Sequence, residues 1–221
     1  MAPRSEADTL LAGCRELGVV PPSGAVERLS AYLDLLEKWN RAYNLTAVRN
    51  RDEMVLRHLL DSLAIVPYLQ GQRFIDVGSG AGLPGLPLAI CLPQKDFILL
   101  DSNGKKTRFL FQVQQTLLLE NVEIANARVE TYRPGRPVDG VLSRAFASLA
   151  DMVTLCAPLT ADGTILYAMK GPRPESEINE LHDTGAHISV KPIKIPGLGE
   201  QHSLVTIPAL QERQPKVAAR T

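Results

Sequence analysis

A loop with a glycine at every second residue is the stretch of this sequence best suited to bind a ligand. Gly78, Gly80 and Gly82 follow an apolar run at residues 73–77, and a second apolar segment begins at Leu86. Strand, glycine loop and helix in this order bring a nucleotide-like ligand against backbone N–H groups at a helix N-terminus. Glycine suits the loop because a Cβ would hold the ligand away and would penalise positive φ angles.

The loop satisfies two patterns that favour different ligands. Gly78, Gly80 and Gly82 give G-x-G-x-G, whereas Gly80, Gly82 and Gly85 give G-x-G-x-x-G, the dinucleotide fingerprint. The next apolar run ends at Asp101, about twenty residues beyond the glycines. An acid at this place can accept hydrogen bonds from both hydroxyls of an adenosine ribose. An adenosine-containing ligand is therefore expected under either pattern.

Asp76 separates the two patterns, because it lies two residues before the first glycine. A dinucleotide site usually has a small or apolar residue there. A carboxylate suits a ligand with positive charge, such as the ammonium and sulfonium groups of S-adenosylmethionine. Asp76 could act on the ligand directly or by bracing the loop, and a bracing aspartate without ligand contact is an equal alternative.

Cations stand at the ends of neighbouring segments. Lys105, Lys106 and Arg108 open the next predicted helix, where each positive charge costs roughly 0.3–1 kcal/mol. An RNA phosphate would explain them, and a solvated helix face would explain them equally well. Arg144 and Lys170 follow two later apolar runs, and the ligand crevice of an open parallel sheet lies outside the carboxyl ends of its strands. We therefore predict that both meet ligand or substrate.

A second basic region lies earlier in the chain and mixes cations with aromatic side chains. Its members are Arg41, Arg49, Arg51, Arg57, Trp39, Tyr43 and His58. Asp52 and Glu53 dilute its charge, so direct RNA contact is one interpretation and a helix face against the core is the other.

Composition narrows the classes of protein. The chain has 221 residues, 45% of them hydrophobic and 22% charged, which is ordinary for a globular enzyme. Its 24 basic and 24 acidic residues cancel, so any RNA contact must come from a local patch. The three cysteines form no C-x-x-C, and the four histidines show no metal-ligand spacing. We expect no metal.

The sequence also indicates the cellular compartment of the protein. The charged first residues do not resemble a signal peptide, and no apolar run approaches the ~18 residues that a membrane span needs. Widely spaced cysteines fit a reducing compartment. A cytoplasmic protein without a membrane partner is expected.

Two kinds of segment position these residues. Residues 1–70 predict a helical extension of about three helices, the third running from Asn50 to about Leu69. Residues 71–210 alternate strands and helices, which predicts an α/β domain with a mainly parallel sheet covered on both faces. Strands are expected at 73–77, 97–101, 122–127, 138–143, 164–169, 187–195 and 202–207, and later helices at 105–120, 150–159 and 174–183. The last two strands could pair as a hairpin, and residues 211–221 are expected to form a frayed tail.

Several segments taken together resemble one family. They are residues 36–46 (LEKWNRAYNLT), residues 57–62 (RHLLDS), the glycine loop with Leu83-Pro84-Gly85, Leu100-Asp101-Ser102 and Ser143-Arg144-Ala145-Phe146. Over roughly residues 25–207 the chain resembles the bacterial 16S rRNA guanine-N7 methyltransferases, the glucose-inhibited division protein B family. Each motif alone is unspecific, but their joint order is specific.

The resemblance implies a class I S-adenosylmethionine-dependent methyltransferase, with a Rossmann-like, seven-stranded and mostly parallel sheet. It implies methyl transfer to N7 of one guanosine in 16S rRNA, within the small ribosomal subunit. The family's cofactor positions carry over onto Gly78, Leu83, Val129, Glu130 and Arg144. The family's ribose-binding acid matches Asp101.

Guanine N7 already presents a free lone pair, so no general base is expected. Arg144 and Lys170 are then the candidates for orienting substrate or cofactor. Two alternatives stay open at this point. One is a nicotinamide-dependent oxidoreductase that uses the G-x-G-x-x-G at residues 80–85, and the other is a non-catalytic ribosome-binding module.

Overall fold

A computed structural model describes residues 5–144, 148–161, 163–182 and 187–209. The predicted tail at residues 211–221 lies outside this part of the chain, as do Ala145 and Phe146.

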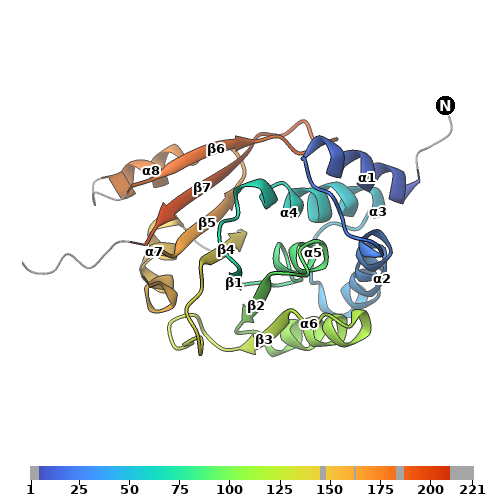
Figure 1. The fold of residues 1–221 in the computed structure, drawn as a ribbon, viewed down its shortest axis with the longest axis horizontal. Coiled ribbons are helices and arrows are strands. Elements are labelled where there is room, and N and C mark those ends of the chain that lie inside the picture. Colours follow the sequence, from blue (N-terminus) through green and yellow to red (C-terminus); the bar gives the residue numbers. More distant parts are fainter. Residues whose placement is uncertain (1–4, 145–147, 162, 183–186, 210–221) are drawn as a thin grey trace, which may run out of the picture.

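The centre of the fold is a seven-stranded sheet in the order β3-β2-β1-β4-β5-β7-β6 (Figure 1). The strands are β1 (Arg73–Val77), β2 (Asp96–Asp101), β3 (Val122–Asn126), β4 (Gly140–Arg144), β5 (Ile165–Lys170), β6 (Ser189–Ile193) and β7 (His202–Pro208). Strand β7 runs antiparallel to β5 and β6, and the remaining neighbours are parallel. The expected mostly parallel sheet and the expected pairing of the last two strands are confirmed.

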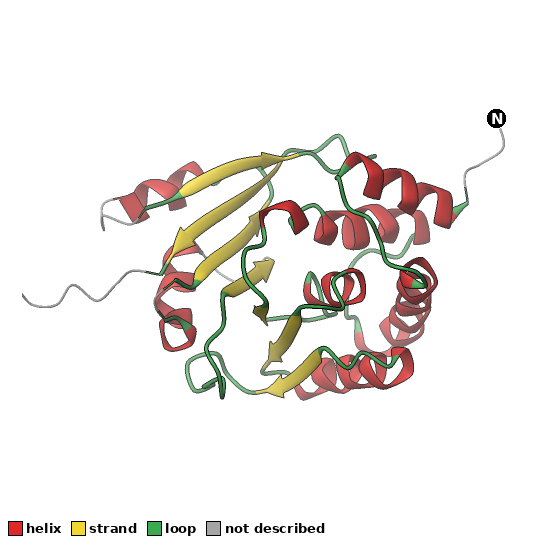
Figure 2. Cartoon of the chain, in the orientation of Figure 1, coloured by secondary structure: helices red, strands yellow, loops and turns green. Residues whose placement is uncertain are grey.

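Helices cover both faces of this sheet (Figure 2). The helices are α1 (Glu6–Glu16), α2 (Ala25–Tyr43), α3 (Arg51–Met54), π-helix η1 (Val55–Leu60), α4 (Asp61–Leu63), 3-10 helix η2 (Val66–Tyr68), α5 (Gly85–Cys91), α6 (Gly104–Leu117), α7 (Leu149–Cys156), 3-10 helix η3 (Ala157–Leu159) and α8 (Glu175–His182). One buried cluster joins α1, α2, η1, α5 and α6 to the sheet, and a second joins α7 and α8 to it.

The side chains of β1 alternate between the two faces of the sheet, so this strand contributes to both buried clusters. Phe74 belongs to the cluster under α2 and α5, whereas Ile75 and Val77 belong to the cluster under α7 and α8. Side chains of a strand point alternately to opposite faces. Asp76 therefore points to the same face as Phe74, beneath α5.

The N-terminal helices and the sheet share this first cluster. Leu33 of α2 and Leu59 of η1 are fully buried in it together with Phe74 and Leu83. The hydroxyl of Tyr32, on α2, donates a hydrogen bond of 2.9 Å to the carbonyl of Ala81 in the glycine loop. The helical extension is thus packed directly on the loop that the sequence singles out.

The third N-terminal helix differs from the expected one. A single helix was predicted from Asn50 to about Leu69, and the Asn50 side chain does cap it by accepting from the Glu53 N–H at 3.0 Å. The backbone then widens into the π-helix η1 and tightens again at α4 and η2. A π-helical turn inside an α-helix is rare and is frequently found at functional sites.

Helix α1 approaches η1 closely enough to require a glycine. A Cβ built on Gly13 would lie 2.6 Å from Cδ2 of Leu60, a side chain that is itself buried. This contact fixes the distance between the two helices.

Candidate active site

The strand order reverses between β1 and β4, and the helices that follow these strands, α5 and α7, pack on opposite faces of the sheet. This is the arrangement in which α/β folds bind ligands outside the carboxyl ends of the strands. The glycine loop follows β1 at this point. Gly78 and Ser79 donate their N–H groups to the carbonyl of Leu100 at 2.8 and 3.1 Å. The loop is thereby fixed against the end of β2, where Asp101 lies.

Asp76 lies beneath the loop and is fully buried. Its Oδ2 accepts the N–H of Gly85 at 3.0 Å, and a Cβ on Gly85 would lie 2.8 Å from the same oxygen. Burial raises the pKa of Asp76 to about 7, although the Gly85 hydrogen bond and the charge of Arg144 act in the opposite direction. This geometry agrees with the bracing interpretation of Asp76.

Asp101 holds the loop from the other side and remains open to a ligand. Its Oδ2 accepts the N–H of Gly80 at 2.9 Å, and its Oδ1 accepts the N–H of Asn103 at 2.8 Å. A carboxylate has about four lone-pair positions, so both oxygens can accept a further hydrogen bond. Asp101 thus keeps the capacity that ribose hydroxyls require.

A cavity of about 330 Å³ lies against these residues at the ends of β1, β2 and β3. It is lined by Gly78, Leu100, Asp101, Ser102, Lys106, Ala127, Arg128, Val129 and Glu130. Four residues predicted to bind the cofactor therefore meet at one cavity, although the chain separates the first from the last by about fifty residues. Its volume falls within the ~300–1,000 Å³ usual for ligand sites.

The surface of the loop is open at Gly80. A Cβ on Gly80 would meet nothing closer than the Gly78 carbonyl oxygen at 3.7 Å and Lys106 Nζ at 4.0 Å. The backbone there has φ +60°, a conformation that favours glycine. A side chain at this position would project into open space beside Asp101, where a ligand backbone could lie instead.

Asp76, Gly80 and Arg144 were predicted to bind the cofactor but do not line this cavity, and the same holds for Gly82 and Leu83. A Cβ on Gly82 would lie 3.0 Å from Leu110 on α6, so this glycine allows close packing of the loop. Leu83 is buried in the core beneath the loop. Both shape the loop in this structure, and their contact with the cofactor stays a prediction.

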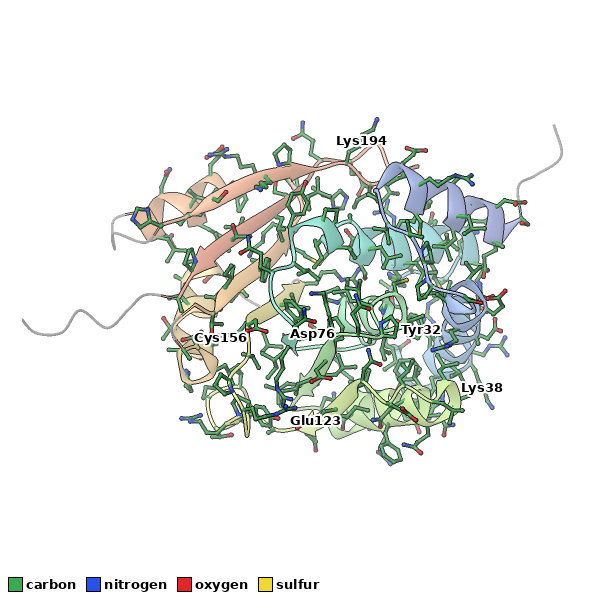
Figure 3. All side chains as sticks on the ribbon, viewed as in Figure 1. Tyr32, Lys38, Asp76, Glu123, Cys156 and Lys194 are labelled. Carbon is green, nitrogen blue, oxygen red and sulfur yellow. The ribbon has the colours of Figure 1, made fainter. Side chains whose placement is uncertain are left out.

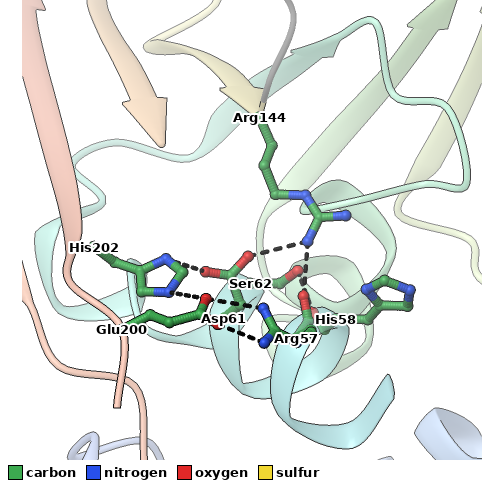
Figure 4. Close-up of polar contacts among 7 residues, drawn as sticks. All are labelled: Arg57, His58, Asp61, Ser62, Arg144, Glu200 and His202. Atoms are coloured by element: carbon green, nitrogen blue, oxygen red, sulfur yellow. Dashed lines mark hydrogen bonds and ion pairs between the residues drawn. The ribbon is translucent and has the colours of Figure 1, made fainter. Parts of the chain in front are cut away.

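Arg144 turns from the end of β4 toward the N-terminal helices (Figure 4). Its Nη1 donates to Oδ2 of Asp61 at 3.0 Å and to the carbonyl oxygen of Arg57 at 2.9 Å. Asp61 is also 3.6 Å from Nδ1 of His202, and Arg57 forms an ion pair with Glu200. The π-helix η1 thus presents a carbonyl group, and the start of α4 a carboxylate, to the cation that ends β4.

Lys170 ends β5 and pairs with an acid on α8. Its Nζ lies 2.9 Å from Oε2 of Glu177, and the same oxygen accepts the N–H of Leu149 at 2.7 Å. The carboxylate therefore connects β5, α7 and α8 at the edge of the sheet.

The cations at the start of α6 divide into two groups. Lys106 faces the cavity, with Nζ 3.9 Å from Oδ2 of Asp101. Lys105 and Arg108 are exposed, and Arg108 donates to the carbonyl of Gly104 at 3.2 Å. Lys105 and Arg108 do not line the cavity and are accessible to a partner such as RNA.

Much of the second basic region is engaged within the protein. Arg51 pairs with Glu6 at 2.6 Å and with Asp34 at 2.9 Å, which ties α3 to α1 and α2. Burial lowers the pKa of His58 to about 4, so this side chain is neutral. Trp39 packs against Phe109 of α6, with ring centroids 5.7 Å apart. These three residues serve the fold.

The described part of the chain also bears on metal binding and on membrane insertion. Among residues 5–144, 148–161, 163–182 and 187–209, no group of three or more His, Cys, Asp or Glu side chains is arranged to hold a metal ion. In the same part of the chain, no helix combines the length and the apolar character that crossing a bilayer requires.

Comparison with solved structures identifies the fold. Magnesium protoporphyrin IX methyltransferase from Synechocystis PCC 6803 with bound S-adenosylmethionine gives a TM-score of 0.56 at 16% identity, covering 94% of this chain and 99% of that one. A SAM-dependent methyltransferase from Aquifex aeolicus gives 0.55 at 17% identity, covering 75% and 97%. The chain has the fold of S-adenosylmethionine-dependent methyltransferases.

Sequence comparison goes further. A protein called ribosomal RNA small subunit methyltransferase G from Salmonella arizonae is 52% identical over 191 residues, covering 86% of this chain and 92% of that protein. The protein of the same name from Salmonella agona is 55% identical over 178 residues, covering 80% and 86%. The family described as rRNA small subunit methyltransferase G matches residues 25–205. The chain therefore belongs to the rRNA small subunit methyltransferase G family.

Proposed function

We propose that this protein transfers the methyl group of S-adenosylmethionine to N7 of one guanosine in 16S rRNA, in the cytoplasm and on the small ribosomal subunit. The observation that carries the proposal is the meeting of Gly78, Asp101, Val129 and Glu130 at one cavity beside the switch point of the sheet. Family membership supports the same conclusion. Methyltransferases of this kind need a site for the adenosyl group and a separate opening through which the acceptor base reaches the methyl group.

The chain's own residues account for cofactor binding. Asp101 would accept the two ribose hydroxyls, and Val129 and Glu130, at the far wall of the cavity, would bind the adenine edge. Lys106 lies in the same cavity, so we place it beside the cofactor and leave Lys105 and Arg108 as the RNA contacts. When bound, S-adenosylmethionine supplies an electrophilic methyl group carried on a sulfonium.

Chemistry at N7 asks for positioning rather than proton transfer. The N7 lone pair is free, so a base is unnecessary. Holding nucleophile and methyl group in line can supply about 7–11 kcal/mol of the barrier reduction. Arg144 and Lys170, at the ends of the adjacent strands β4 and β5, are the proposed orienting cations.

Alanine at either cation tests this assignment. Arg144→Ala and Lys170→Ala should each lower kcat at least tenfold, because the acceptor loses its alignment. In calorimetry the affinity of Lys170→Ala for S-adenosylhomocysteine should stay within about threefold of the wild-type value. Arg136→Ala is the control, since Arg136 is exposed and pairs with Asp96 near the opposite end of the strands. Retained kcat in both variants would remove these cations from the reaction.

Methyl transfer itself is tested with tritiated S-adenosylmethionine and small ribosomal subunits from a strain that lacks the protein. We expect one methyl group per subunit, mapped to N7 of a single guanosine. Naked 16S rRNA serves as the comparison substrate and shows whether the assembled particle is needed. Binding of S-adenosylhomocysteine without transfer to either substrate would instead favour a non-catalytic ribosome-binding module.

A further inference from the structure

A second and larger cavity opens at the same edge of the sheet, beside β6 and β7. Its volume is about 660 Å³, and we call it the β6–β7 cavity. It is lined by Arg173, Val190, Pro192, Ile193, Lys194, Leu198, Gly199, Glu200, Gln201, His202 and Ser203. The register pairs Lys170 at the end of β5 with Ser203. The cavity therefore shares the edge at which Arg144 and the glycine loop lie.

The lining combines the two surfaces that a nucleotide needs. The apolar lining comes from both faces of β6: Val190 and Pro192 point to the face of α7 and α8, whereas Ile193 and Leu198 pack with the other core cluster. Lys194 and Arg173 are the cations of the lining. Apolar or planar surfaces receive the face of a base, and cations receive the phosphate. The volume of this cavity lies within the ~300–1,000 Å³ that is usual for ligand sites.

The charges around the β6–β7 cavity favour an anionic ligand. Glu200 is the acidic residue in its lining, and its charge is paired with that of Arg57, which donates to its two oxygens at 2.9 and 2.5 Å. Arg173 pairs with Glu175, but both side chains are more than half exposed, so this pair is weak. Lys194 is exposed and has no ion pair with another described residue.

Contacts join this cavity to the proposed reaction site. His202 lines the cavity and lies 3.6 Å from Asp61, which in turn binds Arg144 at 3.0 Å (Figure 4). One strand, β5, separates β7 from β4, and neighbouring strands lie about 4.8 Å apart. The cavity is thus roughly 10 Å from the end of β4, too far for the reacting base but suitable for a nucleotide next to it.

We propose that the β6–β7 cavity binds a nucleotide of the rRNA that flanks the methylated guanosine, with its base against Leu198 and its phosphate on Lys194 and Arg173. This inference rests on the proposed function. It assigns to the two antiparallel strands the recognition of RNA around the target.

Steady-state methylation of unmodified small subunits tests the proposal. The double variant Lys194→Ala/Arg173→Ala should raise KM for the particle about tenfold and leave kcat and the Kd for S-adenosylhomocysteine unchanged. The slope of log(1/KM) against log salt should become shallower by about 0.7 for each lost phosphate contact to single-stranded RNA. Lys38→Ala is the matched control, because Lys38 is exposed on α2, well apart from Lys194 (Figure 3).

A variant of the apolar lining supplies an independent measurement. Leu198→Glu places a carboxylate where the base would lie and should also raise KM for the particle, whereas Leu198→Met should keep the wild-type value. Thermal unfolding of both variants shows whether they are folded. If KM and the salt slope of the double and the Glu variant equal those of the wild type, the proposal is overturned.

Two further outcomes are distinguishable. A raised KM without any change in the salt slope would mean that a ribosomal protein contacts the cavity, and would also overturn the proposal. Absence of methyl transfer by the wild-type protein would contradict the proposed function instead.

Discussion

Asp76 of β1 and Asp101 of β2 both accept hydrogen bonds from the glycine loop, yet their surroundings give them different properties. Asp101 lines the proposed cofactor cavity and accepts two backbone N–H groups. Asp76 is sealed beneath the loop, and its Oδ1 has no hydrogen-bond partner among the described residues. A carboxylate in such a place is easier to keep neutral than charged.

This difference predicts an unusual pH dependence for Asp76. Burial raises its pKa from 3.8 to about 7, so between these values the folded chain keeps a proton that the unfolded chain has lost. Stability from this group is therefore present at low pH and is lost as pH rises toward 7. Asp76→Asn cannot lose a proton, and its side-chain oxygen can still accept from Gly85. Relative to wild type, the variant should gain roughly 1.4 kcal/mol per pH unit between about pH 5 and 7.

Urea denaturation at pH 5, 6 and 7 measures the effect. Asp96→Asn is the control, because Asp96 is exposed at the start of β2. Parallel stability curves for wild type and Asp76→Asn would show that Asp76 is ionised throughout.

The spacing of the residues was enough to predict that Gly78 and Asp101 lie close together. In this fold a glycine loop follows the first strand, and the neighbouring strand ends in an acidic residue beside that loop. The directions of Arg144 and Lys106 were not predictable. Arg144 is fixed by Asp61, 83 positions earlier in the chain, and Lys106 by the rotation of α6 about its axis. Contacts of this kind leave no local signal in the sequence.

At the scale of elements, the sheet was the most predictable part. Each strand was placed within about two residues of its observed ends, because apolar runs bounded by turn residues mark buried strands. The π-helix η1 was missed. In its widened turn the carbonyl of Arg57 accepts a hydrogen bond from Arg144, and the carbonyl of His58 accepts one from the Ser62 hydroxyl. The spacing of apolar residues in the sequence does not indicate these bonds.

Packing of α1 on η1 provides a test at this scale. Gly13→Ala would gain about 1 kcal/mol of helix propensity, but its methyl group would collide with the buried Leu60. Overpacking costs about 1–3 kcal/mol, so we expect a net loss of about 1 kcal/mol in urea denaturation. Gly135→Ala is the control, since nothing lies within 4 Å of the added carbon. A stabilised Gly13→Ala would show that α1 can move away.

At the scale of the molecule, the two predicted parts, residues 1–70 and residues 71–210, share one hydrophobic core. Leu33 and Leu59 pack in one cluster with Phe74 and Leu83. The cofactor cavity, Arg144, Lys170 and the β6–β7 cavity are all at the carboxyl edge of the parallel strands. The sequence predicted this edge from strand order, but not that α1 to α4 would help to build it.

The shared core predicts one cooperative unfolding transition. Trp39 is the sole tryptophan and packs on Phe109 between α2 and α6, so its fluorescence reports the N-terminal helices. Far-ultraviolet circular dichroism reports the whole fold. The two denaturation curves should coincide, and a fluorescence change at lower urea would show instead that residues 1–70 unfold separately.

Tyr32 connects these scales. Its hydroxyl bond to Ala81 makes the order of α2 and the shape of the glycine loop thermodynamically linked. Through this bond, a ligand that orders the loop also orders α2. A change that disorders α2 lowers the affinity for that ligand by the same factor. The order of α2 is therefore expected to change when the cofactor binds. A small molecule that bound between α2 and the glycine loop would inhibit the protein without entering the proposed cofactor cavity.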